Sequence, residues 1–248
     1  MKRKTHHWTL MLSVIFVTVS AAFYLLHFIL FKDVHHIWIY LVGDIAFLPI
    51  EVLLVTVILH RLLEHRDKKA KMEKLNMVIG TFYSETGTQM LEILAKADTN
   101  LERFRETLVF TQNYTRKDFE RAAVLVRKLG IRLDVNLLSF KNLQTLLAEQ
   151  RKFLLELLKN PNLLEHESFT DLLMATFHLT EELVNRKNLE QLTENDKNHL
   201  LFDVERVYAL LVSQWLYYMR HLKEEYPYLF SFALRTNPFD LHAKVEID

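Results

Sequence analysis

Two carboxylates and a proline interrupt a hydrophobic run that is long enough to cross a bilayer. The stretch GDIAFLPIEVLLV, residues 43–55, contains Asp44, Pro49 and Glu51. Seven residues separate the two acids, so on a helix they share one face, about 10 Å apart along the axis. Pro49 also leaves the carbonyl of Ile45 without its helical donor. Because a central charge in a bilayer costs about 2.5–3.5 kcal/mol on insertion scales, these acids are candidates for a functional site.

The preceding apolar run supplies polar side chains at matching depths. Counted inward from the ends of the runs, four of them can hydrogen-bond a carboxyl group: Tyr24 and His27 lie nearest Asp44, and Thr18 and Ser20 lie nearest Glu51. Neither run contains a Lys or Arg that could neutralise the acids. The carboxyl groups must therefore find partners among hydroxyl and imidazole groups, water, or another chain.

Three interpretations of the two acids stay open. In the first, they are neutral or hydrogen-bonded and hold the helices together, as polar side chains do in membranes. In the second, several copies assemble so that the second runs line a wet pathway with rings of carboxylates, which attract cations. Two helices cannot enclose a channel, so this interpretation requires an oligomer. In the third, the acids pair with a basic residue of a partner membrane protein.

The two runs, about residues 8–31 and 37–59, are each long enough to span a bilayer core of about 30 Å. A cleaved signal peptide is the alternative for the first run, with Val19-Ser20-Ala21 as the cleavage site. The apolar residues continue well past that site, which favours an uncleaved anchor. The sequence therefore predicts a transmembrane hairpin over residues 1–60.

Basic residues predict how this hairpin is oriented. They precede the first run and follow the second, whereas the connecting loop KDVHH offers only Lys32: Lys2, Arg3, Lys4, Arg61, Arg66, Lys68, Lys69, Lys71 and Lys74. Cytoplasmic loops carry the excess of Lys and Arg, so both termini are expected in the cytoplasm. The expected location is the cell membrane, with two spans in contact with the lipid bilayer.

Composition and motifs exclude several functions. The 31 basic residues balance 31 acidic ones, so no surface for nucleic acid is expected. The chain has no cysteine, no phosphate-binding glycine loop and no nucleophile elbow. We therefore expect neither an enzyme nor a cofactor. The pairs His178 with Glu182 and His199 with Asp203 each share a helix face, but they sit on charged helices and no Glu-x-x-His motif accompanies them, so no metal site is expected.

Residues 61–113 have the pattern of a long amphipathic helix. Apolar residues recur at a mean spacing of 3.6 from Met72 to Leu108, which indicates one helix, or two in phase with a break at 98–100. Thr99 with Glu102 then forms a capping box. The small residues on a neighbouring face are expected to let another helix come close: Gly80, Ser84 and Gly87.

Residues 114–248 are predicted to form a cytoplasmic α-helical bundle. Caps and breaks mark helix starts at Thr115…Asp118, Ser168…Asp171 and Thr193…Asp196, and an end at Gly130. The apolar segment 207–219 is too short to cross a bilayer and is expected in the bundle core. No segment alternates with period two, so the predicted fold class is an all-α membrane protein.

Taken together, these features favour an oligomeric integral membrane protein with a cation channel or other cation-conducting role. Asp44, Pro49 and Glu51 would form its intramembrane polar face. The alternative is a membrane-anchored scaffold or signalling adaptor, whose helical bundle binds a partner while the hairpin only tethers it.

Overall fold

The part of the chain that the structure describes is built from α-helices. In this computed structural model it comprises residues 2–161, 163 and 166–246, and within these ranges the pairing of extended chain is limited to an isolated bridge between Asp98 and Leu133. The chain divides into two compact units, Met1–Asp67 and Lys68–Asp248. The all-α class expected from the sequence is thus confirmed for the described residues.

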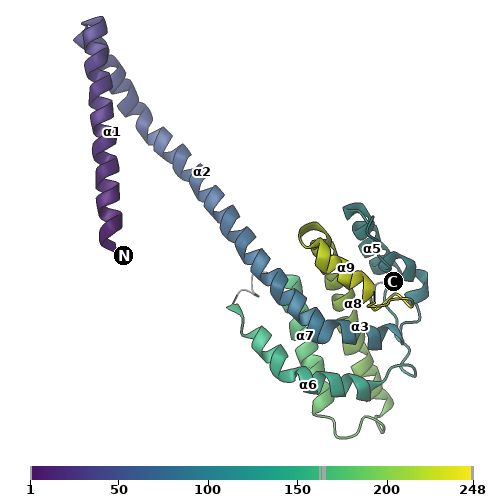
Figure 1. The fold of residues 1–248 in the computed structure, drawn as a ribbon. Helices are drawn as coiled ribbons and strands as arrows, with labels where there is room; N and C mark the ends of the chain where they lie inside the picture. Colours follow the sequence, from purple (N-terminus) through teal and green to yellow (C-terminus); the bar gives the residue numbers. More distant parts are fainter. Residues whose placement is uncertain (1, 162, 164–165, 247–248) are drawn as a thin grey trace. The chain divides into compact units, whose positions relative to one another are not determined.

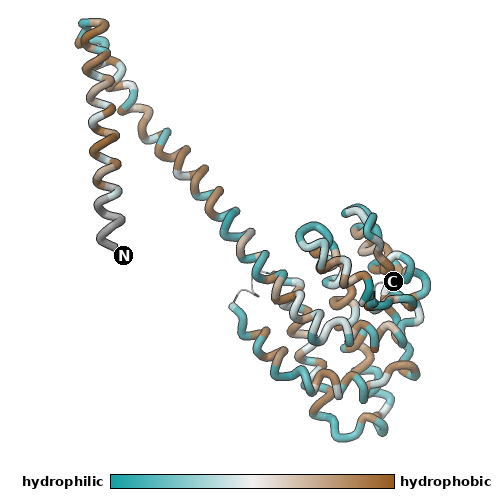
Figure 2. The backbone as a smooth tube through the Cα atoms, in the orientation of Figure 1, coloured by the Kyte–Doolittle hydropathy of each residue, from teal (hydrophilic) through white to brown (hydrophobic). Residues whose placement is uncertain are grey.

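The first unit contains two long apolar helices, α1 (Lys2–Phe31) and the beginning of α2 (Val34–Phe82). Lys32, at φ 50°, turns the chain between them, and Asp33 Oδ1 accepts hydrogen bonds from the backbone N–H groups of His35 and His36. Both helices are long and apolar enough to cross a membrane, and the most apolar window of each has no buried residue. Figure 2 shows apolar residues along both helices.

The second apolar helix does not end with the apolar run. α2 continues to Phe82, passes into a π-helix, η1 (Tyr83–Gly87), and then into α3 (Thr88–Ala95). The helical run therefore stops shortly before the break expected at 98–100. Between Ala95 and residue 113 the described chain forms the 3₁₀ turn η2 (Leu101–Arg103) and the short α4 (Arg105–Leu108). The long helix expected over residues 61–113 therefore ends earlier than the sequence pattern predicts.

Five further helices complete the second unit in the described ranges. They are α5 (Arg116–Leu129), α6 (Phe140–Leu158), α7 (Glu167–Val184), α8 (Glu194–Glu225) and α9 (Pro227–Arg235). The longest, α8, contacts α3, α5, α7 and α9, and α6 packs on α7 and η1. Figure 1 shows these helices gathered into one bundle.

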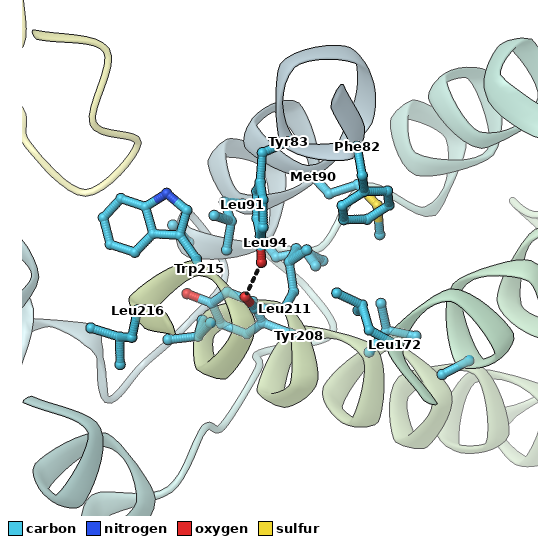
Figure 3. Packing of buried hydrophobic residues seen from close by; sticks show 14 of the residues in the cluster. Phe82, Tyr83, Met90, Leu91, Leu94, Leu172, Tyr208, Leu211, Trp215 and Leu216 are labelled. Atoms are coloured by element: carbon cyan, nitrogen blue, oxygen red, sulfur yellow. Dashed lines mark hydrogen bonds between the residues drawn. The ribbon is translucent and has the colours of Figure 1, made fainter. Parts of the chain in front are cut away.

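The core of the bundle forms around α8. The segment 207–219 contributes seven buried apolar side chains: Val207, Tyr208, Leu211, Val212, Trp215, Leu216 and Met219. These pack against Phe82, Tyr83 and the buried leucines of α3 (Figure 3). The prediction that 207–219 lies in the core is confirmed, and of the apolar positions predicted from Met72 to Leu108 all are buried except Met72 and Ile93, which are partly buried.

The predicted helix caps had different outcomes. Those at Thr115 and Thr193 are confirmed: Asp118 accepts a hydrogen bond from the Thr115 N–H, and Thr193 Oγ1 accepts one from the Asp196 N–H. The start predicted at Ser168 was wrong, because α7 begins at Glu167. The cap is the imidazole of His166, whose Nδ1 accepts from the N–H of Phe169 at 3.2 Å.

The capping box predicted at Thr99 and Glu102 was also wrong. The Thr99 hydroxyl donates to the carbonyl of Arg132 at 3.0 Å, and Glu102 binds the guanidinium of Arg105 at 2.6 Å. A distant backbone carbonyl thus binds the Thr99 side chain, and a neighbour one turn along the chain binds Glu102. At the end of α5, by contrast, Gly130 adopts a φ of 71°, as the glycine signal predicts.

Candidate functional site

Asp44 lies in an open cavity between α1 and α2. The cavity measures about 520 Å³, and seven side chains line it: Ser20, Phe23, Tyr24 and His27 from α1, and Ile37, Tyr40 and Asp44 from α2. Tyr24 and His27 thus share a cavity with Asp44, as the depth count predicts. Ser20 belongs to the same cavity, although its depth had placed it nearer Glu51.

The two carboxylates have different surroundings. Within the residues that the structure describes, neither Asp44 nor Glu51 forms a hydrogen bond or an ion pair with another side chain, and both are exposed. Glu51 does not line the cavity that contains Asp44. Thr18 does not serve either acid, because its hydroxyl donates to the carbonyl of Val14 in its own helix at 2.8 Å. α2 runs through Pro49 without ending.

Aromatic rings pack against one another beside this cavity. His27 stacks on His36 with ring centroids 5.9 Å apart, and His36 meets Tyr40 edge to face at 4.8 Å. The Nε2 atom of His27 is buried and, among the described residues, has no hydrogen-bond partner. The imidazole therefore packs against neighbouring rings, and its buried Nε2 atom is left without a partner among the described residues.

The small residues of the second unit accommodate aromatic rings. A Cβ atom added to Gly80 would lie 3.2 Å from the hydroxyl of Tyr218, and one added to Gly87 would lie 2.6 Å from Cδ1 of Tyr83. The two tyrosines stack at 5.2 Å. Ser84 is exposed. The atoms nearest to Gly80 and Gly87 thus belong to aromatic side chains, from α8 at Gly80 and from the same helical run at Gly87.

The two histidine–carboxylate pairs noted in the sequence meet across α7 and α8. His178 Nε2 lies 3.5 Å and His199 Nε2 3.6 Å from Oδ2 of the buried Asp203, and His199 also lies 3.6 Å from Glu182 Oε2. Arginines already bind both carboxylates: Arg186 contacts Glu182 at 2.6 Å, and Arg206 contacts Asp203 at 3.2 Å.

These arginines give the α7–α8 cluster a structural role. The hydrogen bond from Arg186, together with that cation's charge, holds the pKa of Glu182 below its ordinary value. In the described ranges, no group of three or more His, Asp or Glu side chains is arranged to hold a metal ion. We therefore interpret the cluster as an electrostatic link between α7 and α8.

Sequence reasoning missed part of the cavity lining. Phe23, Ile37 and Tyr40 were not singled out, and Tyr40 lies one helical turn before Asp44 on the same face. The spacing of four residues between Tyr40 and Asp44 was the available signal. Phe23 gave no such signal, because an aromatic residue in an apolar run is indistinguishable from one that faces lipid.

Comparison with known proteins places the chain in a family. Residues 2–63 match the model of the MJ1433 N-terminal helical domain, and residues 71–235 match that of the C-terminal helical domain of the uncharacterized protein MJ1433. The chain belongs to the MJ1433 family. It is 41% identical over 233 residues to the uncharacterized protein MJ1433 of Methanocaldococcus jannaschii, and the match covers 94% of each chain. No solved structure matches.

The two MJ1433 family models divide the chain near the point where the structure does. The gap between residues 63 and 71 contains the boundary between Asp67 and Lys68. The Asp44 cavity falls within the range matched by the N-terminal model, and the α7–α8 cluster within the range matched by the C-terminal model.

Proposed function

We propose that this chain is an oligomeric integral membrane protein that binds a cation at Asp44 and takes part in moving it across a cell membrane. The observation that carries the proposal is the cavity that contains Asp44, which lies between two helices of apolar surface. An acid with no basic partner in its own helices is expected to attract a cation. The hairpin would cross the membrane twice, with both termini cytoplasmic.

The exposed surfaces of the hairpin support the membrane part of the proposal. Large apolar side chains from Leu10 to Leu63 are exposed at about half of their area or more in most cases. Contiguous apolar surface of this extent is unfavourable in water at about 25 cal/mol per Å². Lipid acyl chains, together with helices of other copies, would cover these faces.

Glu51 supports the oligomeric part. It is exposed, lies outside the Asp44 cavity and has no partner among the described residues of its own chain. In an assembly of several copies, the Glu51 side chains would face one another across a wet pathway, where water and cations solvate them. Two helices cannot enclose such a pathway, so the proposal requires about four or more chains.

Ion flux in proteoliposomes tests the proposal. Asp44→Asn combined with Glu51→Gln should abolish cation flux, because both variants keep the shape and remove the charge. Asp67→Asn is the matched control, since Asp67 is exposed at the end of the first unit, outside the cavity. Flux that is unchanged in the double variant would exclude a conducting role for these acids. A purified protein that is monomeric or dimeric in nanodiscs, with bound lipid subtracted, would exclude the pore.

A second function is favoured by the independent core of the bundle. Residues from Leu75 to Phe239 form one cluster of buried side chains within the second unit, without the hairpin. Such a unit suits a scaffold or signalling adaptor that binds a partner protein, with the hairpin as its membrane anchor. In that case the Asp44→Asn, Glu51→Gln variant would retain partner binding, and the wild-type protein would show no flux.

A further inference from the structure

The Asp44 cavity has the size and lining of a site for an organic cation. Resting on the cation role proposed above, we propose that it binds a primary ammonium group carried by a small organic molecule. Sites for small molecules usually measure about 300–1,000 Å³, and this cavity measures about 520 Å³. A single dehydrated metal ion would leave most of that space empty.

Rings around the carboxylate provide the first chemical argument. Phe23, Tyr24 and Tyr40 line the cavity with Asp44, and no Lys or Arg does. Aromatic faces attract ammonium groups by cation–π interaction, with about 0.5–2 kcal/mol per ring according to how fully the pair is desolvated. The carboxylate supplies the counter-charge. Rings plus one acid match a cation that also has apolar surface to bury.

The donor set provides the second argument. Hard metal ions need several oxygen ligands, about six to eight for Ca²⁺ and six for Mg²⁺, and soft ones prefer clustered imidazoles or thiolates. The cavity offers one carboxylate and one imidazole, and the described residues hold no group of three or more metal-ligating side chains. A bare ion would lose more hydration than these groups replace. An ammonium group needs only a few acceptors for its N–H bonds.

The imidazole of His27 supplies one of those acceptors. Its Nε2 atom is buried without a hydrogen-bond partner among the described residues, and the ring is held against His36. A neutral imidazole accepts one hydrogen bond at its unprotonated nitrogen. With Asp44 and the Ser20 hydroxyl on the same cavity, the three N–H bonds of a primary ammonium have three acceptors.

Primary ammonium groups reach a membrane protein from two sources, a free amine or the headgroup of a phospholipid. Calorimetry on the full chain separates them. The protein is placed in nanodiscs of phosphatidylglycerol, which carries no ammonium group, and titrated with ethylammonium, Na⁺ and K⁺ at constant ionic strength. A second set of nanodiscs contains phosphatidylethanolamine. Ethylammonium should bind in the first set, and Na⁺ or K⁺ at the same ionic strength should not displace it. Loss of this binding in the second set assigns the site to the lipid headgroup.

Matched variants locate the site. Asp44→Asn should abolish ethylammonium binding, while Asp67→Asn, at an exposed acid of the same helix outside the cavity, should leave it unchanged. Tyr40→Phe keeps the ring and should bind as the wild type does, whereas Tyr40→Leu should weaken binding by about 2- to 30-fold, the equivalent of one cation–π contact. Circular dichroism and size-exclusion profiles confirm that each variant is folded.

The outcomes separate this inference from the function on which it rests. If Na⁺ or K⁺ binds at Asp44 and ethylammonium does not, the ammonium site is refuted and the cation role stands. If no cation binds in either lipid, both are refuted. Equal affinities of Tyr40→Leu and Tyr40→Phe would refute the part assigned to the aromatic rings.

Discussion

The packing of Gly87 against Tyr83 predicts that an alanine, ordinarily the better helix former, will destabilise the bundle. Gly87 ends the π-helix η1, and a Cβ atom there would lie 2.6 Å from Cδ1 and 3.1 Å from Cε1 of the Tyr83 ring. Two contacts hold that ring in place. Its hydroxyl donates to the carbonyl of Leu211 at 2.8 Å (Figure 3). Its face stacks on Tyr218. It cannot turn away without losing them.

The expected magnitude follows from two opposing terms. Replacing a helical glycine by alanine stabilises by about 0.5–1 kcal/mol. Overpacking a well-filled core costs about 1–3 kcal/mol. Because the contact involves the rigid near edge of a buried ring, the steric term is expected to win, with a net loss of about 1 kcal/mol. For a unit of this length, that loss lowers Tm by about 2–4 °C.

Thermal unfolding of the full chain, followed by near-ultraviolet circular dichroism in detergent, measures the effect. Gly43→Ala is the control, because no heavy atom lies within 4 Å of a Cβ atom added there, and its Tm should not fall. In a Tyr83→Ala background, the cost of Gly87→Ala should shrink by about 1 kcal/mol or more, leaving only the contact with Phe82 at 3.0 Å. A Gly87→Ala protein with the wild-type Tm or a higher one would refute the argument.

Two further variants test single contacts in the bundle. Burial raises the pKa of Asp98, so the native state favours the protonated acid, and stability is lost as pH rises through that raised pKa. In denaturant titrations, the free energy of unfolding of Asp98→Asn should match that of the wild type near pH 4 and exceed it increasingly towards pH 7. A constant difference across this range would contradict the prediction. Thr193→Ala removes the cap whose hydroxyl accepts from the Asp196 N–H at 3.2 Å, and should cost about 1 kcal/mol, or about 2–4 °C in Tm. Thr145→Ala is its control, because the exposed Thr145 hydroxyl only bonds back within its own helix, and equal Tm losses in the two variants would rule out the cap.

The bundle core was predictable because its signals are local. The apolar spacing from Met72 to Leu108 identified buried positions beyond the end of the helix at Ala95 as well, namely Leu101, Phe104 and Leu108. The caps at Thr115 and Thr193 were predictable for the same reason. Each depends on a side chain three residues from its backbone partner.

What the sequence did not reveal depends on contacts between distant segments. His166 caps α7 although imidazole is an uncommon cap, and the hydroxyl of Ser168 instead accepts from Gln214 at 2.5 Å. The π-helix at Tyr83–Gly87 was not predicted either, and the Tyr83 hydroxyl within it bonds to the carbonyl of Leu211, far along the chain. Counting residues inward from the ends of the two apolar runs placed Tyr24 and His27 near Asp44. The count could not determine how the helices are rotated about their axes.

The two acids that the sequence grouped on one face of α2 differ in their surroundings. Asp44 shares a cavity with a hydroxyl, an imidazole and two phenols of its own hairpin, whereas Glu51, two turns further along α2, has none of these. In a bilayer an unpartnered carboxylate is costly, by about 2.5–3.5 kcal/mol near the centre. The hairpin thus surrounds Asp44 with polar side chains that do not bond to it among the described residues, and it offers Glu51 no such surroundings. Under the function that we propose, the cavity at Asp44 would form a cation site within one chain, and Glu51 would be solvated only in an assembly of several chains.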